Sequence, residues 1–351
     1  MKMTIRYFKQ HSRSTLIRFA IITFICLVVA TLVSQAVIDN YDSWKNYVDR
    51  ESYYQNKPYE YHWSVNPQLG VHVFIIVFLC TALPMIELSA FNSRRYLDSA
   101  FSFPISRTSM VSVNLINGYL QFLLSYTLSF IWYAIRLVHC ADKLNFEPIW
   151  DFFFISLLYS LFLYAFNAFF FSLCNSTADG AIVAIAWQHI FCPIALTYTE
   201  IFDIKWYDQQ LFIVWYPLGE ISEHCGDLAR GDASVPDLGT QNNHAMLICL
   251  IVIAVLALLF IAGTIFFFSR KRAESAGEIS DTPIGYKVLI PVITGILLYW
   301  ALEAGGGIIS LLALIFATVS YIIYRRGVRF KVFDIVVIGA CFVCFMMGIM
   351  G

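Results

Sequence analysis

Charged residues are scarce in this chain of 351 residues: 13% are Asp, Glu, Lys or Arg, whereas 59% are hydrophobic. A typical soluble domain has about 25% charged residues. The mean hydropathy is +0.68, and so few charges do not suit the surface of a soluble protein. The composition therefore excludes a soluble globular domain and predicts an integral membrane protein.

Motifs for catalysis and for metal binding are also missing. The chain has no H-E-x-x-H, no G-x-S-x-G and no G-x-x-x-x-G-K-[ST] phosphate loop. The segment 223–227 groups ligand-type residues, but one His in an acidic loop is typical of a solvated surface. We expect no catalytic residue, no metal site and no cofactor bound by this chain, and we do not expect nucleic acid among its partners.

Ionisable residues are rare inside the apolar runs, where their cost makes them a functional signal. Glu87 is the best placed, and it is expected either to reach the interface or to pair with Arg94 or Arg95. His189 is expected to be a buried histidine bonded to a neighbouring helix. Prolines do not interrupt two halves of the chain at matching positions. These features disfavour an ion-coupled secondary carrier, which stays an alternative.

Cysteine is used as a small hydrophobic residue rather than in paired motifs. Nine cysteines are scattered along the chain, mostly inside apolar runs and with no C-x-x-C pair. Only Cys140 and Cys225 fall in loops predicted to lie outside, and the sequence does not tell whether they pair.

Long apolar runs dominate what is present. A helix needs roughly 20 mainly apolar residues to cross about 30 Å of hydrocarbon. About nine runs qualify, with the seventh the shortest, so we expect an all-α protein with a six-span core and about three additional C-terminal spans. The runs lie at 19–38, 71–90, 111–135, 152–174, 181–199, 246–269, 288–302, 308–324 and 332–350.

The positions of Lys and Arg predict the orientation, because these residues are retained on the cytoplasmic side of short loops. A cytoplasmic N-terminus places 16 of the 23 basic residues inside. Residues 1–18 then form a cytoplasmic amphipathic segment, followed by a core at 19–269, a cytoplasmic linker at 270–287 and an extension at 288–351. The first run is longer than the core of a signal peptide, so we expect it to be retained.

Two loops predicted to lie outside are long enough to have structure. Residues 39–70 are rich in Tyr and Trp, which is typical of an aromatic belt at the level of the lipid headgroups and is also compatible with an amphipathic substrate. Residues 200–244 are acidic but contain an apolar patch at 211–218 that is too short to span. We expect this patch to form a re-entrant helix that neighbouring protein covers.

The loop at 91–110 is short, basic and amphipathic, and it lies between two long apolar runs on the predicted cytoplasmic side. Leu97 and Phe101 share one face at helical spacing. Pro104 is expected to stop a helix there, and Ser106 and its neighbours are suitable caps for the next span. A soluble partner that consumes energy could bind this loop and move the spans on either side of it.

Three features resemble the permease subunits of ABC transporters of the ABC-2 exporter type, in a bacterial subgroup. Residues 99–107, Ser-Ala-Phe-Ser-Phe-Pro-Ile-Ser-Arg, are similar to the family's "SLPIxR" segment, with Phe103 in place of the usual Leu. Residues 270–277, Arg-Lys-Arg-Ala-Glu-Ser-Ala-Gly, are similar to its "RxxExAG" exit sequence. The layout is the third feature, with an amphipathic N-terminal segment, six spans and a re-entrant outer helix.

The resemblance implies that loop 91–110 is a coupling helix that docks on a separate ATP-binding subunit. A second, smaller coupling contact would lie at residues 175–180, and the exit motif would face the cytoplasm. The implied coupling residues are Arg94, Arg95, Asp98, Phe101, Pro104, Arg107, Asn175 and Asp179, and the exit motif comprises Arg272, Glu274 and Gly277.

The resemblance also implies the biological setting. The chain would be a multi-pass permease of the bacterial cytoplasmic membrane and a subunit of an exporter, with ATP and Mg²⁺ used only by its ATPase partners. A second permease copy or a paralogue and membrane lipid complete the expected partners. A secondary carrier and a non-transporting scaffold or sensor are the alternatives, and the cargo and the direction of transport stay open.

Overall fold

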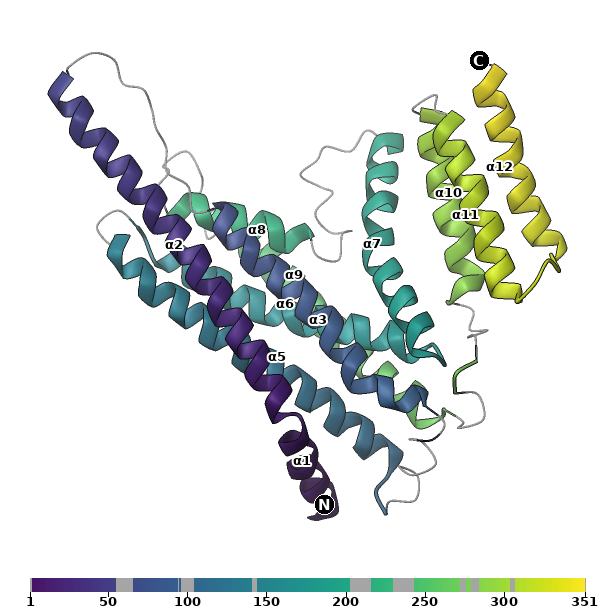
Figure 1. Cartoon of the computed structure of the whole chain (residues 1–351), viewed down its shortest axis with the longest axis horizontal. Helices are drawn as coiled ribbons and strands as arrows, with labels where there is room; N and C mark the ends of the chain where they lie inside the picture. Colours follow the sequence, from purple (N-terminus) through teal and green to yellow (C-terminus); the bar gives the residue numbers. More distant parts are fainter. Residues whose placement is uncertain are drawn as a thin grey trace. The chain divides into compact units, whose positions relative to one another are not determined.

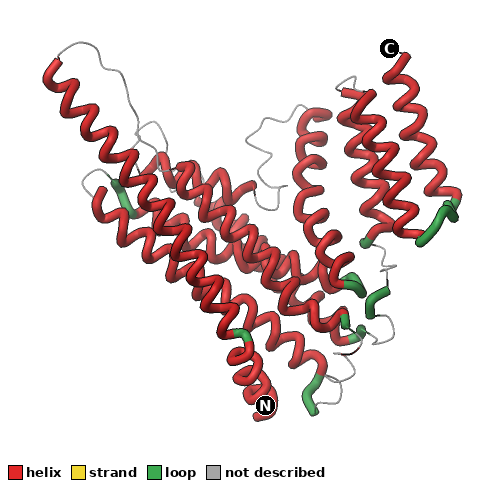
Figure 2. Tube along the Cα trace, in the orientation of Figure 1, coloured by secondary structure: helices red, strands yellow, loops and turns green. Residues whose placement is uncertain are grey.

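The computed structural model is helical throughout the part of the chain that it describes, and no strand occurs in that part (Figure 1; Figure 2). The described residues are 2–54, 66–93, 95, 104–140, 144–202, 216–229, 243–271, 276–278, 284–303 and 307–350. The helices are α1 Lys2–Ser14, α2 Leu16–Tyr54, α3 Asn66–Ser89, η1 Ala90–Asn92, α5 Arg107–Leu137, η2 Val138–Cys140, α6 Glu147–Ser172, α7 Thr177–Phe202, α8 Tyr216–Ala229, α9 Asn243–Ser269, α10 Tyr286–Glu303, α11 Gly307–Arg325 and α12 Val332–Met350.

The apolar runs of the sequence coincide with helices. Within the described residues, 6 helices are long and apolar enough to cross a membrane, and two shorter apolar helices lie at Tyr286–Leu302 and Val332–Met347. The chain is thus an all-α protein with about six long apolar helices, as a multi-pass membrane protein requires.

The first helix of the core runs farther than its apolar stretch. α2 continues to Tyr54, so much of the predicted outside loop 39–70 is helical. No Pro or Gly interrupts residues 39–54, and the Gln35 amide donates to Asp39 one turn later at 2.8 Å. Nothing local therefore ends the helix where hydrophobicity falls.

The predicted re-entrant patch at 211–218 lies mostly outside the described residues. α8 begins at Tyr216, at the end of this patch, and carries the segment 223–227 on its last turns. The acidic segment is therefore helical rather than an irregular loop.

Residues Met1–Leu88, Phe101–Ala168 and Trp215–Ser269 form one compact unit. Its core is aromatic, because α5 places Phe122, Tyr126 and Phe130 one turn apart on a single buried face. Phe153 of α6 stacks on this face, with ring centroids 4.8 Å from Phe130 and 5.9 Å from Tyr126. α5 also packs against α1, α2 and α9, so it is the central helix of this unit.

Residues Ser89–Ala100, Phe169–Val214 and Arg270–Gly351 form a second compact unit. Here α10, α11 and α12 pack against one another, and α10 also packs against α7 (Figure 1). Ala313, Ala317 and Cys341 are fully buried where α11 meets α12. Small residues let the two backbones approach closely, which is how helices commonly associate in lipid.

Gly118 allows close packing inside the first unit. A Cβ atom at this position would lie 2.8 Å from Glu87 Cγ and would also meet the Tyr164 hydroxyl. That hydroxyl donates to the Leu115 carbonyl at 3.0 Å, so it is not free to move away. Gly118 therefore sets the distance between α5 and its neighbours α3 and α6.

We expect Gly118→Ala to lower the free energy of unfolding by about 1–3 kcal/mol, because the added methyl group overpacks this contact. Gly70→Ala is the matched control, since nothing lies within 4 Å of a Cβ atom there. Denaturant titration in mixed micelles measures both. Equal stability of the two variants would contradict the packing role of Gly118.

Candidate functional site

The loop predicted to couple to a partner is described only at its two ends. Arg95 is exposed, and so are Pro104 and Arg107. The other predicted coupling residues of this loop, Arg94, Asp98 and Phe101, lie outside the described residues. The structure therefore leaves the predicted coupling helix itself untested.

A serine cap begins the helix that follows this loop. Ser106 has an extended backbone, and its Oγ accepts a hydrogen bond from the Ser109 amide at 3.2 Å. Arg107 is the first residue of α5, directly after the cap. The prediction that Ser106 caps this span is confirmed, and the cap fixes where the exposed Arg107 emerges.

The second predicted contact, at residues 175–180, is a turn that leads into α7. Ser176 Oγ accepts a hydrogen bond from the Asp179 amide at 3.1 Å, which is the bonding pattern of an N-cap. Asp179 Oδ1 accepts a hydrogen bond from the Tyr286 hydroxyl at 2.9 Å. Asp179 is thus held between the start of α7 and the start of α10, within the second unit.

The exit segment after α9 packs on the same turn. The Gly277 amide donates to the Asn175 carbonyl at 2.8 Å. Gly277 has a φ of +84°, a conformation that favours glycine. Arg272 and Glu274 lie outside the described residues. A hydrogen bond therefore joins the predicted second coupling contact, at Asn175, to the predicted exit motif, at Gly277.

Lys271 anchors the exit segment to two other parts of the second unit. Its side chain is almost fully buried, and its Nζ donates to Asn92 Oδ1 at 2.6 Å and to the Cys174 carbonyl. Burial lowers the pKa of Lys271 to about 7, because the charged amine loses its hydration. The sequence showed only a basic cluster at 270–272, which is normally solvated, so it did not reveal this buried amine.

A second polar cluster lies inside the first unit, around Glu87. The side chain of Glu87 is only 1% exposed. Its described partners include Arg18 of α2 and His11 of α1: Arg18 Nη2 donates to Oε1, and His11 Nε2 lies 2.8 Å from Oε2. Of the two arginines predicted as possible partners, Arg95 is exposed and Arg94 lies outside the described residues. α1 and α2 both pack against α5, which brings His11 and Arg18 to this carboxylate, and the sequence did not predict this packing.

Amides of α5 complete the cluster around this carboxylate. Asn117 Nδ2 and Gln121 Nε2 donate to Glu87 Oε1 at 2.9 and 3.0 Å. Ser12 Oγ in turn donates to Asn117 Oδ1 at 3.0 Å, and Arg18 Nε donates to Gln121 Oε1 at 3.0 Å. The network connects α1, α2, α3 and α5 and satisfies a charge that would be costly alone.

The sequence held a signal for this network that we did not use. Asn114, Asn117 and Gln121 recur at helical spacing on one face of an otherwise apolar run. Such a polar stripe in a predicted span indicates a polar partner within the bundle.

The histidine expected to be buried is a different one. His189 is exposed, and its Nδ1 contacts the Ile185 carbonyl of its own helix at 2.8 Å. His72 of α3 is fully buried instead, with its ring 4.7 Å from that of Tyr133 and 5.2 Å from that of Phe130. The sequence analysis did not single out His72.

Among the described residues, neither a metal site nor a disulfide between Cys140 and Cys225 is present. No group of three or more His, Cys, Asp or Glu side chains is arranged to hold a metal ion there. Cys140 and Cys225 are both buried and form no disulfide with each other.

Comparisons with protein families, with curated proteins and with solved structures found no match to this chain.

We expect Arg18→Gln to lower the free energy of unfolding by about 3 kcal/mol, because it leaves the Glu87 carboxylate buried without its cationic partner. The double variant Arg18→Gln, Glu87→Gln removes both charges and should recover most of this loss. Arg13→Gln is the control: Arg13 is exposed on α1, so we expect a change within about 0.5 kcal/mol. Additive losses in the double variant would contradict the pairing.

We expect the wild-type protein to become more stable than Lys271→Gln as the pH rises from about 7 towards 10. The folded protein releases the Lys271 proton near pH 7, whereas the ordinary value is 10.5, so the unfolded chain binds more protons in this interval. Thermal unfolding in detergent across this range measures the difference between the two proteins. Parallel pH profiles would show that Lys271 does not titrate in this way.

Proposed function

We propose that this chain is the membrane-spanning permease subunit of an ABC transporter of the ABC-2 exporter type, driven by ATP-binding subunits on separate chains. The coarser part of this assignment, a multi-pass helical membrane protein, rests on the six long apolar helices. The permease assignment rests on the motifs at 99–107 and 270–277 and on the arrangement of the second unit.

The bond between Gly277 and Asn175 is the observation that carries this proposal. It joins the exit segment to the turn at which the family would have its second coupling contact. Lys271 extends the connection to Asn92, at the end of η1, and to the Cys174 carbonyl. Segments that are 97 and 179 residues apart in sequence are therefore linked, which supports a surface on which a partner acts on several helices at once.

A force applied by a partner at this surface would be transmitted to α7 and α10 through hydrogen bonds. Ser176 caps α7, whose first turn contains Asp179, and the Tyr286 hydroxyl donates to Asp179 from the start of α10. Trp187 Nε1 also donates to the Ile284 carbonyl at 2.9 Å, just before α10. Closure of ATPase subunits would tilt these helices as rigid elements and alternate access to the transport path.

The proposed setting is the bacterial cytoplasmic membrane with the N-terminus in the cytoplasm, which follows from the basic residues retained inside. A second permease copy or a paralogue would complete the membrane assembly. ATP hydrolysis belongs to the partner, so this chain needs no catalytic residue and binds no cofactor of its own.

The alternative of an ion-coupled carrier depends on Glu87, and the geometry of this residue favours a structural role. Arg18, Asn117 and Gln121 donate to one carboxylate oxygen, and His11 contacts the other. A guanidinium does not release its proton, and no described contact gives a transported ion a place at the carboxylate. The network therefore has the features of a structural contact that holds α1, α2, α3 and α5 together.

We expect tagged wild-type protein, extracted from its native membrane in mild detergent, to co-purify with a nucleotide-binding chain and ATPase activity. Arg107→Glu should lose both, because it reverses an exposed charge at the expected docking site. The fold should tolerate this change, since an acidic residue in the first turn of a helix is favourable.

Arg13→Glu is the control, as it reverses an exposed charge on α1 and leaves every residue of the loop 91–110 unchanged. Absence of any ATPase from the wild-type eluate would overturn the proposal. Retention of the ATPase by Arg107→Glu would remove Arg107 from the docking site.

A further inference from the structure

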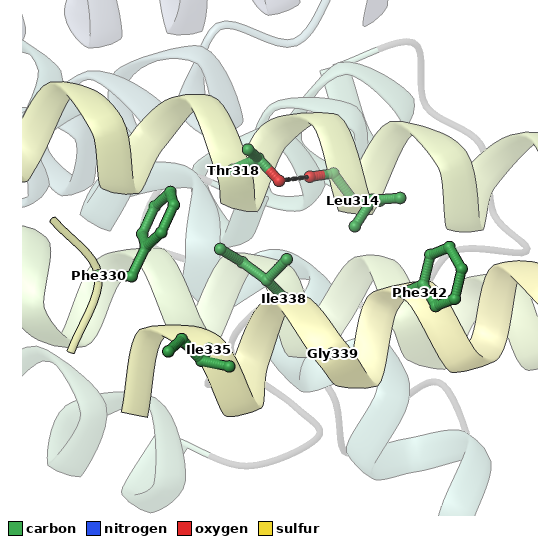
Figure 3. A pocket seen from close by; sticks show the side chains of 7 residues that line it. All are labelled: Leu314, Thr318, Phe330, Ile335, Ile338, Gly339 and Phe342. Carbon is green, nitrogen blue, oxygen red and sulfur yellow. Dashed lines mark hydrogen bonds between the residues drawn. The ribbon is translucent and has the colours of Figure 1, made fainter. Parts of the chain in front are cut away.

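An apolar groove runs between α11 and α12 in the second unit. It has a volume of about 400 Å³. In Figure 3 the groove extends from Phe330, in the turn before α12, to Phe342 farther along that helix. The residues that line it are Leu314, Thr318, Phe330, Ile335, Ile338, Gly339 and Phe342.

The lining of the groove suits a hydrocarbon chain. Thr318 is its only residue with a polar side chain, and the Thr318 hydroxyl donates to the Leu314 carbonyl at 2.8 Å, as Figure 3 shows. Ile335 and Phe342 are 57% and 53% exposed, so the groove is open to its surroundings. α11 is long and apolar enough to span a membrane. In a membrane the groove would be exposed to lipid, and an acyl chain fits its apolar lining.

Basic residues surround one end of the groove. Phe330 lies directly between Arg329 and Lys331 in the chain, and Arg326 is three residues before Arg329. All three basic side chains are exposed. The turn therefore places positive charge beside the Phe330 end, where the polar headgroup of a lipid seated in the groove would lie.

An ion pair fixes this turn without neutralising it. Arg325 donates to both carboxylate oxygens of Asp334, at 2.9 and 3.2 Å. Asp334 Oδ2 also accepts a hydrogen bond from the Lys331 amide at 2.9 Å. Asp334 is the single acidic residue between 325 and 334, against four basic ones, so three positive charges remain after it pairs with Arg325.

We propose that this groove seats one acyl chain of an anionic phospholipid, whose phosphate group is held by Arg329 and Lys331 at the Phe330 end. The apolar lining selects a lipid chain, and the basic turn selects a negatively charged headgroup over a neutral one. This inference requires only that the chain is embedded in a membrane, and it does not depend on the transport function.

The test uses the full-length protein in phosphatidylcholine vesicles with a trace of phosphatidylglycerol that carries a photoreactive acyl chain. A photoreactive phosphatidylcholine is the neutral comparison, and crosslinked peptides are mapped by mass spectrometry. We expect peptides from α11 and α12 to be labelled about tenfold more by the anionic lipid, since each basic residue near a charged headgroup favours binding.

Charge variants test the headgroup contact. Arg329→Gln with Lys331→Gln should abolish the excess labelling by the anionic lipid and leave the neutral lipid unchanged. The control is Arg6→Gln with Lys9→Gln, which removes two exposed charges from α1, far from the groove in sequence. Equal labelling by the two lipids in the wild-type protein would overturn the proposal.

Two glycines provide a matched test of the groove itself. A Cβ atom would have nothing within 4 Å at Gly339, which lines the groove, or at Gly295 of α10. Gly339→Phe should reduce the labelling of α11 and α12 by both lipids, whereas Gly295→Phe should not. Gly339→Leu repeats the test with a smaller side chain if the Phe variant does not fold. Unchanged labelling in the Gly339 variants would contradict the binding of a lipid chain in this groove.

Discussion

A carboxylate buried among apolar helices is costly unless positive and polar groups surround it. Glu87 meets this condition through Arg18, His11, Asn117 and Gln121, and each of these partners comes from an element other than α3. The charge can therefore be accommodated only when α1 lies against α5 and α2 begins beside α3. Hydrocarbon offers no water to replace a missing partner, so this one requirement constrains how four helices of the first unit assemble. Gly118 belongs to the same constraint, because its missing side chain leaves room for the Glu87 side chain and the Tyr164 hydroxyl.

In the second unit, backbone carbonyl groups rather than a carboxylate are bonded by groups from distant parts of the chain. The carbonyls at Cys174 and Asn175 lie between α6 and α7, outside both helices. They accept hydrogen bonds from the Lys271 amine and from the Gly277 amide. The turn between α6 and α7 is thus completed by residues that lie 97 and 102 positions later in the chain. These bonds attach the segment after α9 to the turn that precedes α7. In the proposed permease, this attachment would let the exit segment transmit force to α7.

The last three helices combine two different kinds of contact. Small residues let α11 and α12 approach closely at Ala313, Ala317 and Cys341. Farther along the same pair, larger side chains and Gly339 leave a groove. The Arg325–Asp334 pair closes the turn between them and keeps the neighbouring basic residues together. The C-terminal extension, for which the sequence predicted no specific role, therefore has a defined feature, the groove that we propose binds a lipid chain.

Hydrophobicity alone determined the class of this protein and the position of its helices, since every apolar run lies within a helix or extends at most two residues beyond its end. Local composition is sufficient to specify a segment that suits a bilayer. The Ser106 cap was also predictable, because capping depends on residues within one turn. The sequence did not predict how far α2 extends, because the helix continues through polar residues that lack a stop signal. Only the tertiary structure decided that Glu87 pairs with Arg18, that His72 rather than His189 is buried, and that Lys271 reaches Asn92. Glu87 and Arg18 are 69 positions apart in the sequence, and Lys271 and Asn92 are 179 positions apart. Such contacts depend on which helix faces pack together, and no local pattern of residues specifies this packing.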